Sequence, residues 1–314
     1  MDKGLQTEGK LNVQNMIEKR MQTKTLGQSL EKIVPWFLLL CAIVSVLTTV
    51  GILFTLLRES IGFFSEVSII DFYTGTEWSP WSGSFGVAPL IGGTLLITLI
   101  ATITAVPLGL MAAIFLSEYA SDKARRIIKP ILEVLAGIPT VVYGYFALTF
   151  VTPIFQAIIP DLGIFNALSG GFVVGVMIIP MVASLSEDAM NSVPNALREG
   201  AYGLGATKHE VVFKVVLPAA FSGIVASIVL AISRAIGETM IVTIAAGATP
   251  SLTFNPTDSI QTMTAFIVQA ATGDTSFGST IYYSLYAVGI TLFIFTLGMN
   301  LIAQYISRKF REEY

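Results

Sequence analysis

Long apolar runs constrain this chain more than any other feature. Six segments are long and apolar enough, or nearly so, to cross a bilayer as helices: 34–57, 89–116, 131–159, 170–185, 218–248 and 280–306. A hydrocarbon core about 30 Å thick takes roughly 20 helical residues, and every backbone N–H and C=O must be bonded within the segment. Only 12% of the 314 residues are charged, against about 25% in soluble domains. The sequence therefore predicts an all-α integral membrane protein of about six transmembrane helices.

The lysines and arginines predict its orientation. Sixteen of the eighteen lie in the tail 1–33, in the loops after the second and fourth runs, and in the tail 307–314. Because basic residues accumulate in cytoplasmic loops, we expect both termini inside a multi-pass protein of the cell membrane, with a transmembrane domain over 34–306. No cleavable signal pattern precedes the first run, which is expected to act as an uncleaved anchor. The outer loop 58–88 carries two tryptophans, expected either to anchor at the membrane interface or to form a docking surface for an external partner.

Small residues and prolines predict where the helices approach and bend. Two pairs of small residues at four-residue spacing would allow close packing: Gly171 with Gly175, and Ala105 with Gly109. Four prolines are natural kink sites: Pro107, Pro139, Pro153 and Pro180.

Catalytic and metal-binding patterns are not evident. The single cysteine, Cys41, excludes a disulfide framework, and the single histidine, His209, stands between charged residues in a polar loop. Residues 4–10 superficially resemble a phosphate-binding loop, but Leu11 takes the place of the Ser or Thr that would hold magnesium. We therefore expect no cofactor and no enzymatic site in this chain, and no nucleic-acid partner. If transport uses ATP and magnesium, a partner ATPase must bind them.

The most specific pattern lies between the fourth and fifth runs, at 195–218. It predicts two short helices broken at Gly205, with Thr207 and Glu210 at capping-box spacing and Pro218 in the first turn of the next helix. The pattern resembles the EAA loop of binding-protein-dependent ABC importer permeases, which reads Glu-Ala-Ala, three residues, Gly, nine residues, Ile-x-Leu-Pro. The matching positions are Glu199, Gly200, Ala201, Gly205, Val215, Leu217 and Pro218, with Gly200 in place of Ala and Val215 in place of Ile.

That resemblance implies the type I ABC importer permease architecture, in which this loop docks on a cytoplasmic ATPase and couples its movement to transport. Three further passages, 133–144, 233–240 and 263–269, resemble the permeases of phosphate importers, and the sequence after Thr239 is closer to the PstC type than to the PstA type. By resemblance, the partners are a PstA-like permease, two PstB-like ATPase subunits and an external PstS-like phosphate-binding protein, in a lipid membrane.

Two charges fall inside the fifth run. A charge within a span costs roughly 2.5–3.5 kcal/mol even on lenient scales, so it normally faces a partner or water. The four-residue spacing of Arg234 and Glu238 predicts that both lie on one helical face. Arg234 could meet phosphate oxygens in a forked geometry, with Glu238 holding the arginine or a gate. A buried ion pair joining helices, or charges paired with a second permease subunit, are the alternatives.

Other functions stay open at this stage. An importer of the same architecture could carry another oxyanion, and a secondary carrier could use Arg234 and Glu238 to relay protons or to coordinate exchange. Importing a doubly charged anion against 100 mV costs about 4.6 kcal/mol, which favours an ATP-driven machine over a passive pore. A membrane enzyme has the least support.

Overall fold

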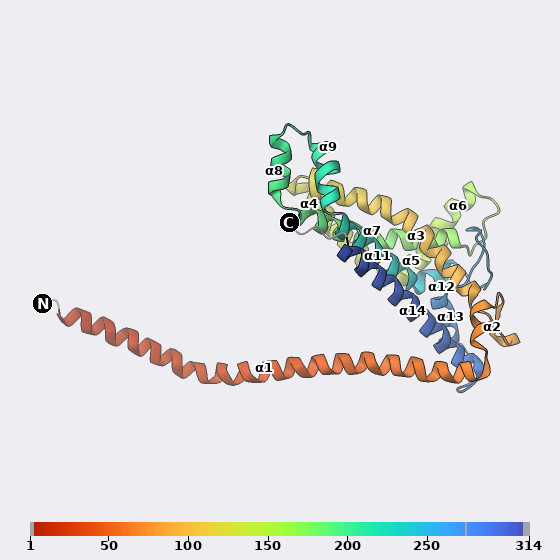
Figure 1. Ribbon diagram of the computed structural model, residues 1–314, viewed down its shortest axis with the longest axis horizontal. Helices are drawn as coiled ribbons and strands as arrows, with labels where there is room; N and C mark the ends of the chain where they lie inside the picture. The colour runs from red at the N-terminus through yellow and green to blue at the C-terminus, as the bar shows by residue number, and fades with distance from the viewer. Residues whose placement is uncertain (1–2, 274, 310–314) are drawn as a thin grey trace. The chain divides into compact units, whose positions relative to one another are not determined.

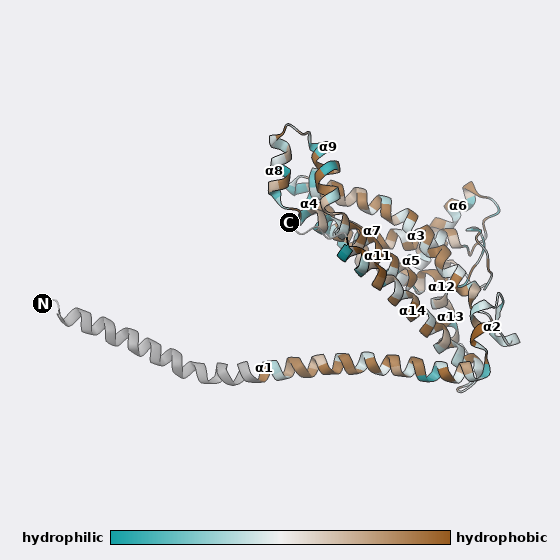
Figure 2. Cartoon of the chain, in the orientation of Figure 1, coloured by the Kyte–Doolittle hydropathy of each residue, from teal (hydrophilic) through white to brown (hydrophobic). Residues whose placement is uncertain are grey.

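The computed structural model describes the backbone of residues 3–273 and 275–309, and the side chains of these residues from Ile33 onward except Ser307. The chain divides into two units, Met1–Leu57 and Arg58–Tyr314. Helix α1 (Lys3–Glu66) runs through the boundary, so the predicted N-terminal tail is helical from Lys3. The first unit is apolar from Ile33 on, where the brown colouring of α1 in Figure 2 begins. The outermost residues of both predicted tails, 1–2 and 310–314, lie outside the described residues.

The second unit is a bundle of helices with one two-stranded ribbon (Figure 1). In it, β1 (Trp78–Ser79) and β2 (Ser84–Phe85) pair antiparallel. The segment η1 (Pro80–Ser82) is a 3₁₀ turn, and η2 (Phe115–Tyr119), η3 (Ala147–Val151) and η4 (Val212–Val216) are single π turns. The elements after α1 are α2 (Ile69–Thr74), β1 (Trp78–Ser79), η1 (Pro80–Ser82), β2 (Ser84–Phe85), α3 (Ala88–Ile114), η2 (Phe115–Tyr119), α4 (Asp122–Gly137), α5 (Thr140–Phe146), η3 (Ala147–Val151), α6 (Thr152–Ile158), α7 (Ala167–Asn191), α8 (Asn195–Gly203), α9 (Lys208–Val211), η4 (Val212–Val216), α10 (Leu217–Ala219), α11 (Phe221–Ile236), α12 (Met240–Ala245), α13 (Met263–Thr272) and α14 (Thr280–Lys309).

The number of membrane spans agrees with the prediction. Within the described residues, five helices are long and apolar enough to cross a bilayer, or six if the pair Lys208–Ala219 and Phe221–Ile236, bent by 68°, counts as one span. The fourth span is longer than predicted, because α7 covers Ala167–Asn191 rather than 170–185.

The predicted start of the third span is wrong. Residues 131–137 belong to α4, a separate charged helix, and the candidate span is Thr140–Ile158. Pro139 explains the break, since a proline disfavours helical backbone in the residue before it. Ile138 is accordingly extended, with φ −66° and ψ 128°. Pro139 therefore ends a helix rather than kinking one, whereas Pro107 and Pro180 lie inside α3 and α7.

The fifth predicted span is interrupted. Helix α11 ends at Ile236 and α12 begins only at Met240, so the run 218–248 is not one continuous helix. A second break precedes it at Ala220, where α10 meets α11. The polar residues between α11 and α12 therefore lie on irregular backbone inside the bundle, which membrane proteins tolerate where protein or a cavity surrounds it.

Close packing of α3 against α7 forms the centre of the second unit. A side chain at Gly175 would meet Thr104 Cβ at 2.7 Å and the carbonyl oxygen of Ala101 at 2.9 Å. At Gly109 it would meet Val182 Cβ at 2.7 Å. The prediction that small residues let these helices approach closely is confirmed.

The two ends of the second unit differ in composition (Figures 1 and 2). One end carries α4, α8 and α9 with their lysines and arginines, and we call it the basic end. The other carries α2 and β1, and we call it the aromatic end for its packed rings: Phe63, Phe72, Trp78, Phe85 and Phe266. Trp78 is only 2% exposed. The expectation that it anchors at the membrane interface or docks a partner is therefore wrong for Trp78, whereas Trp81 is 62% exposed.

Candidate coupling hairpin and polar cavity

The loop 195–218 folds as a helical hairpin at the basic end. Helix α8 ends at Gly203, and Gly205 adopts φ +84°, a left-handed conformation that favours glycine. Thr207 then caps α9: its side chain accepts from the Glu210 backbone N–H, and Glu210 Oε2 accepts from the Thr207 backbone N–H at 3.0 Å. The predicted break at Gly205 and the predicted capping box are both confirmed. We call residues 195–211 the coupling hairpin.

The cap also fixes the charge of Glu210. Hydrogen bonds from the Thr207 backbone N–H and from Lys214, whose Nζ lies 3.1 Å from Glu210 Oε1, lower the pKa of this carboxyl to about 2. Glu210 is therefore ionised at neutral pH, and its negative charge stands in the first turn of α9, where it complements the helix dipole.

One face of α8 and the turn that follows it are open to solvent. Glu199 and Gly200 are exposed, and a side chain at Gly200 or Gly203 would meet no atom within 4 Å. Leu204 is 92% exposed although it is apolar. Sequence reasoning missed Leu204; the available signal was a leucine between two glycines in an otherwise polar loop.

The remaining motif residues form the base of the hairpin. Ala201, Val215 and Leu217 pack against a buried apolar cluster that includes Met190 and Val211. Pro218 is exposed in α10, before the bend at Ala220, so it does not open α11 directly as predicted. The motif therefore divides into an exposed tip and a packed base.

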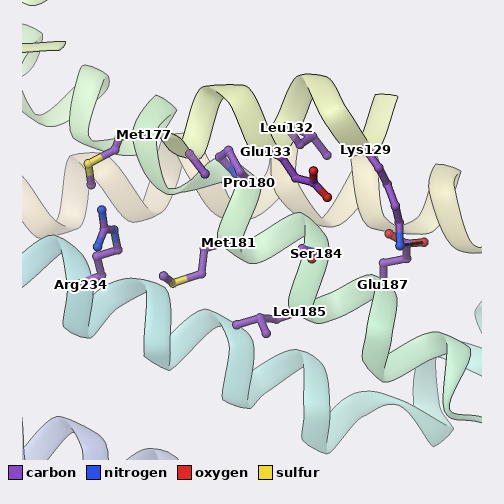
Figure 3. Close-up of a pocket in the computed structure, with 11 residues that line it drawn as sticks. Lys129, Leu132, Glu133, Met177, Pro180, Met181, Ser184, Leu185, Glu187 and Arg234 are labelled. Carbon is purple, nitrogen blue, oxygen red and sulfur yellow. Dashed lines mark ion pairs between the residues drawn. The ribbon is translucent and has the colours of Figure 1, made fainter. Parts of the chain in front are cut away.

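A cavity of about 480 Å³ lies between α4, α7 and α11 (Figure 3). Its wall combines apolar side chains with four charges, two of each sign. The lining residues are Lys129, Leu132, Glu133, Ala136, Met177, Pro180, Met181, Ser184, Leu185, Glu187 and Arg234. Three elements that are separate in the sequence thus supply charge to one space in the bundle.

Glu187 is the buried charge of this cavity. Its side chain is 1% exposed, and Oε1 lies 3.0 Å from Lys129 Nζ and 3.7 Å from Arg125 Nε. The other oxygen, Oε2, has no hydrogen-bond partner within the described part of the chain. Figure 3 shows Lys129 and Glu187 together at one end of the cavity and Arg234 at the other. Sequence reasoning also missed Glu187, because it lies near the end of a long apolar helix and its partners come from α4.

The structure separates Arg234 from Glu238. Because α11 ends at Ile236, the two side chains do not share a helical face, and the predicted four-residue geometry is wrong. Arg234 lines the cavity and is exposed, with no ion pair shown to any residue the structure describes. Glu238 is 7% exposed, and its Oε1 accepts from the backbone N–H groups of Met240 at 3.1 Å and Ile241 at 3.4 Å.

Glu238 also joins two helices across the bundle. Its backbone carbonyl accepts a 2.7 Å hydrogen bond from Thr264 Oγ1 of α13. The residue therefore stabilises the break between α11 and α12, while Arg234 faces the cavity. The interpretation of these two charges as one pair does not hold.

Comparison with known proteins identifies a family and several relatives that this chain resembles. Residues 105–312 match the family model described as binding-protein-dependent transport system inner membrane component. A relative from Bacillus subtilis, the probable ABC transporter permease protein YqgH, is 35% identical over 86% of this chain and 88% of its own length. The phosphate transport system permease protein PstC of Mesorhizobium japonicum is 34% identical over 75% of this chain and 77% of its own.

A solved structure shares the fold. It is a bacterial ABC transporter involved in the import of the acidic polysaccharide alginate, which aligns with a TM-score of 0.63 over 88% of this chain and 96% of that chain at 16% identity. At this identity the likeness concerns the fold, including helices that the apolar runs predicted.

Proposed function

The chain belongs to the binding-protein-dependent transport system inner membrane component family, and from this premise we propose that it is a membrane permease subunit of an ATP-driven importer of inorganic phosphate. The basic end would then face the cytoplasm, as the distribution of lysines and arginines predicts. The phosphate assignment is supported by the PstC relatives and by the resemblance of residues 133–144 and 233–240.

The observation that carries the proposal is the coupling hairpin. A carrier driven by an ion gradient needs no contact for an ATPase, whereas this chain presents Glu199 and Gly200 exposed on α8, and Leu204 exposed on the turn that Gly205 and a capping box hold. The base of the hairpin packs against a buried apolar cluster, which would let it move as a unit with that cluster. Rigid contact at the base and an apolar residue at the tip fit an element that docks on a second protein.

The cavity gives Arg234 its role in the proposal. A guanidinium that is not paired with a protein carboxylate can donate two parallel N–H hydrogen bonds to the oxygens of an anion. We propose that Arg234 contacts phosphate as it passes, and that Glu238 acts as a gate element by holding the helix break. Alternating access would open the path to one side at a time.

The partners follow from the same proposal. A PstA-like permease would complete the membrane path, two PstB-like ATPase subunits would bind ATP and magnesium and receive the hairpin, and a PstS-like protein would deliver phosphate from outside. Glu199, Gly200, Ala201, Gly205, Leu217 and Pro218 would couple the ATPase to the path.

The test is uptake of labelled phosphate in cells that lack this chain and are complemented with the original or with Glu199→Lys. ATP depletion and collapse of the proton gradient are applied separately. We expect uptake that needs ATP, survives collapse of the gradient and is lost in the variant. Uptake that follows the gradient and ignores Glu199→Lys would establish a secondary carrier instead. Absence of labelled phosphate uptake together with ATP-dependent uptake of labelled sulfate or molybdate would assign another oxyanion.

Arg234 is tested in the same cells. Arg234→Gln should abolish most uptake while the complex still assembles, because the guanidinium is proposed to act on the anion and not on the fold. Arg126→Gln, which removes an exposed arginine of α4 outside the cavity, is the matched control. Equal loss in both variants would assign the effect to the cytoplasmic charge balance and not to an anion contact.

A further inference from the structure

Both arms of the coupling hairpin contact adjacent residues of the π turn η2, at the end of α3. From α8, Arg198 Nη2 lies 3.1 Å from Glu118 Oε1. From α9, Lys208 Nζ lies 4.9 Å from the centre of the Tyr119 ring, within the range of a cation–π contact. The hairpin therefore contacts η2 from two sides through neighbouring positions.

Arg198 makes several contacts besides its ion pair with Glu118. Its guanidinium also donates to the carbonyl oxygens of Val193 at 2.6 Å and Met190 at 2.8 Å, and to Asn195 Oδ1 at 3.1 Å. The side chains of Arg198 and Glu118 are only 15% and 8% exposed. One largely buried cation thus joins the start of α8, the end of α7 and η2. Such contacts are shorter and less screened than a surface pair.

The π turn η2 also contacts α4 and α7. Arg125 of α4 donates to the carbonyl oxygens of Leu116, at 2.6 Å from Nη2, and Ser117, at 3.2 Å. Ser117 Oγ donates to Asn191 Oδ1 of α7 at 3.0 Å. Arg125 in turn lies beside Glu187, which lines the cavity. A chain of polar contacts therefore runs from the hairpin through η2 to the cavity wall.

The position of a π turn at this point has a physical consequence. A π turn shifts the hydrogen bonds of a helix from the i+4 to the i+5 residue, and such turns are frequent at functional sites. Glu118 and Tyr119 occupy the π turn that continues α3, and α3 itself packs along α7. A displacement of the hairpin would therefore act first on this turn and through it on α3.

We propose that η2 (Phe115–Tyr119) receives the movement of the coupling hairpin, and that Glu118 and Tyr119 are positioning residues that pass it to α3 and to the cavity. This inference rests on the proposed function, because it assigns how the hairpin acts within the same chain. The rival explanation is that the Arg198–Glu118 pair only stabilises the folded hairpin.

The experiment uses the complete transporter, purified and reconstituted in lipid vesicles with Arg198→Glu, Glu118→Arg and the double exchange. Measured are co-purification of the ATPase, ATP hydrolysis, and phosphate uptake per ATP hydrolysed. Each single reversal should reduce uptake per ATP by roughly tenfold or more, because it leaves like charges in a largely desolvated contact. The double exchange should recover only part of it, because a carboxylate at position 198 can pair with an arginine at position 118 but cannot donate to the carbonyl oxygens of Val193 and Met190.

A matched control separates this contact from general charge effects. Arg126→Glu makes the same charge change on α4 at an exposed arginine for which the described residues show no ion pair, and it should leave uptake per ATP near the original. At the second contact, Tyr119→Phe keeps the ring and should be tolerated, whereas Tyr119→Leu should reduce uptake per ATP. If the charge-reversed variants do not fold, the isosteric variant Glu118→Gln is used instead. It should also reduce phosphate uptake per ATP hydrolysed.

A readout independent of substrate keeps the two proposals apart. A cysteine at the cavity, Ser184→Cys in a Cys41→Ser background, should change its rate of thiol labelling when ATP binds. That change should be lost in Glu118→Arg and reduced in Tyr119→Leu. If labelling responds in this way but phosphate is not taken up, the substrate assignment fails and the inference stands. If Glu118→Arg and Tyr119→Leu leave both readouts near the original, or if the single reversals lose ATPase binding in proportion to uptake, η2 is not the receiver.

Discussion

The aromatic end and the basic end of the second unit are held together by different forces. At the aromatic end, Trp78 meets Phe266 edge-to-face with centroids 4.7 Å apart, and Phe63 meets Phe72 at 5.4 Å. At the basic end, four ion pairs among the described residues link α4 with α7, α8 with η2, and α9 with η4. The first end is held by aromatic rings within one apolar cluster, whereas the second combines a smaller apolar cluster beneath the coupling hairpin with ion pairs between its elements.

The difference indicates which end can move. An apolar cluster loses contacts in proportion to any separation of its parts, so it resists small displacements. Ion pairs that water can reach, such as those of Lys129 and Arg125 with Glu187, exchange with water or with other partners at small net cost. We therefore expect the aromatic end to serve as a static base and these contacts of the basic end to change.

Truncation of the aromatic cluster should have the largest effect. Trp78→Ala should lower the free energy of unfolding by about 3–5 kcal/mol, because it leaves a cavity against Phe266 and Phe72. Thermal unfolding of the purified protein in detergent, followed by near-UV circular dichroism, measures it. Trp78→Phe should cost far less, since the indole N–H has no partner among the described residues. Trp81→Ala, at a 62% exposed position, should be close to neutral. A neutral Trp78→Ala would remove the distinction between the two ends.

Removal of the buried carboxylate at the basic end should cost less. Glu187→Ala should lower the free energy of unfolding by about 1–3 kcal/mol, below the usual cost of breaking a buried pair. The reason is that Lys129 and Arg125, at 38% and 35% exposure, regain water when Glu187 is lost. Glu133→Ala, on the same cavity wall and without a described ion-pair partner, is the control and should be near neutral. A loss as large as that of Trp78→Ala would mean that the basic end is as rigid as the aromatic end.

Two glycines of the coupling hairpin should respond to alanine substitution with opposite changes in stability. Gly205→Ala should destabilise the hairpin by about 1–2 kcal/mol, because a side chain is strained at φ +84°. Gly200→Ala should instead stabilise α8 by about 0.5–1 kcal/mol, since it lies within the helix and no atom lies within 4 Å of the added methyl group. Hydrogen exchange of the α8 amides, compared between the two variants, gives both signs. If both variants changed the stability of α8 in the same direction, the conformation of the hairpin would not depend on the backbone dihedral of Gly205.

The smallest effect concerns pH. The lowered pKa of Glu210, about 2 against an ordinary 4.5, means that its carboxylate contributes stability above about pH 4.5 and loses this contribution as the pH falls toward 2. The hairpin should therefore show no change from Glu210 between pH 6 and 8. A titration of the Glu210 side chain by carbon NMR, with Glu210→Gln as the reference, measures it. A midpoint near 4.5 would show that the capping box is not formed in solution.

Much of the membrane architecture could be predicted from the sequence, because its causes are local. Apolar length decides that a segment can cross a bilayer, and five or six spans result in the described residues. The hairpin was also predictable in detail, since Gly205 and the Thr207–Glu210 pair act within a few residues of one another. Pro139 could have corrected the third span, because its effect on Ile138 is equally local.

The sequence showed which charged residues lie within or beside the membrane spans, but not which of them pair with one another. Arg234 and Glu238 are four positions apart, yet a break after Ile236 gives one to the cavity and the other to the start of α12. Glu118 meets Arg198 across 80 positions, and Lys129 meets Glu187 across the packed faces of α4 and α7. No periodicity reports such pairs, because they depend on how helices cross.

The sequence by itself determined that this chain is a helical membrane protein with a basic side and a glycine-centred hairpin on it. Those properties follow from hydropathy, from the distribution of charge and from backbone dihedral preferences, each of which acts over one helix or less. Only the tertiary structure decided that Trp78 is buried, that Arg234 faces a cavity and that the hairpin contacts η2. The reason is physical: burial and pairing depend on which helices pack together, and that choice is made by the whole bundle.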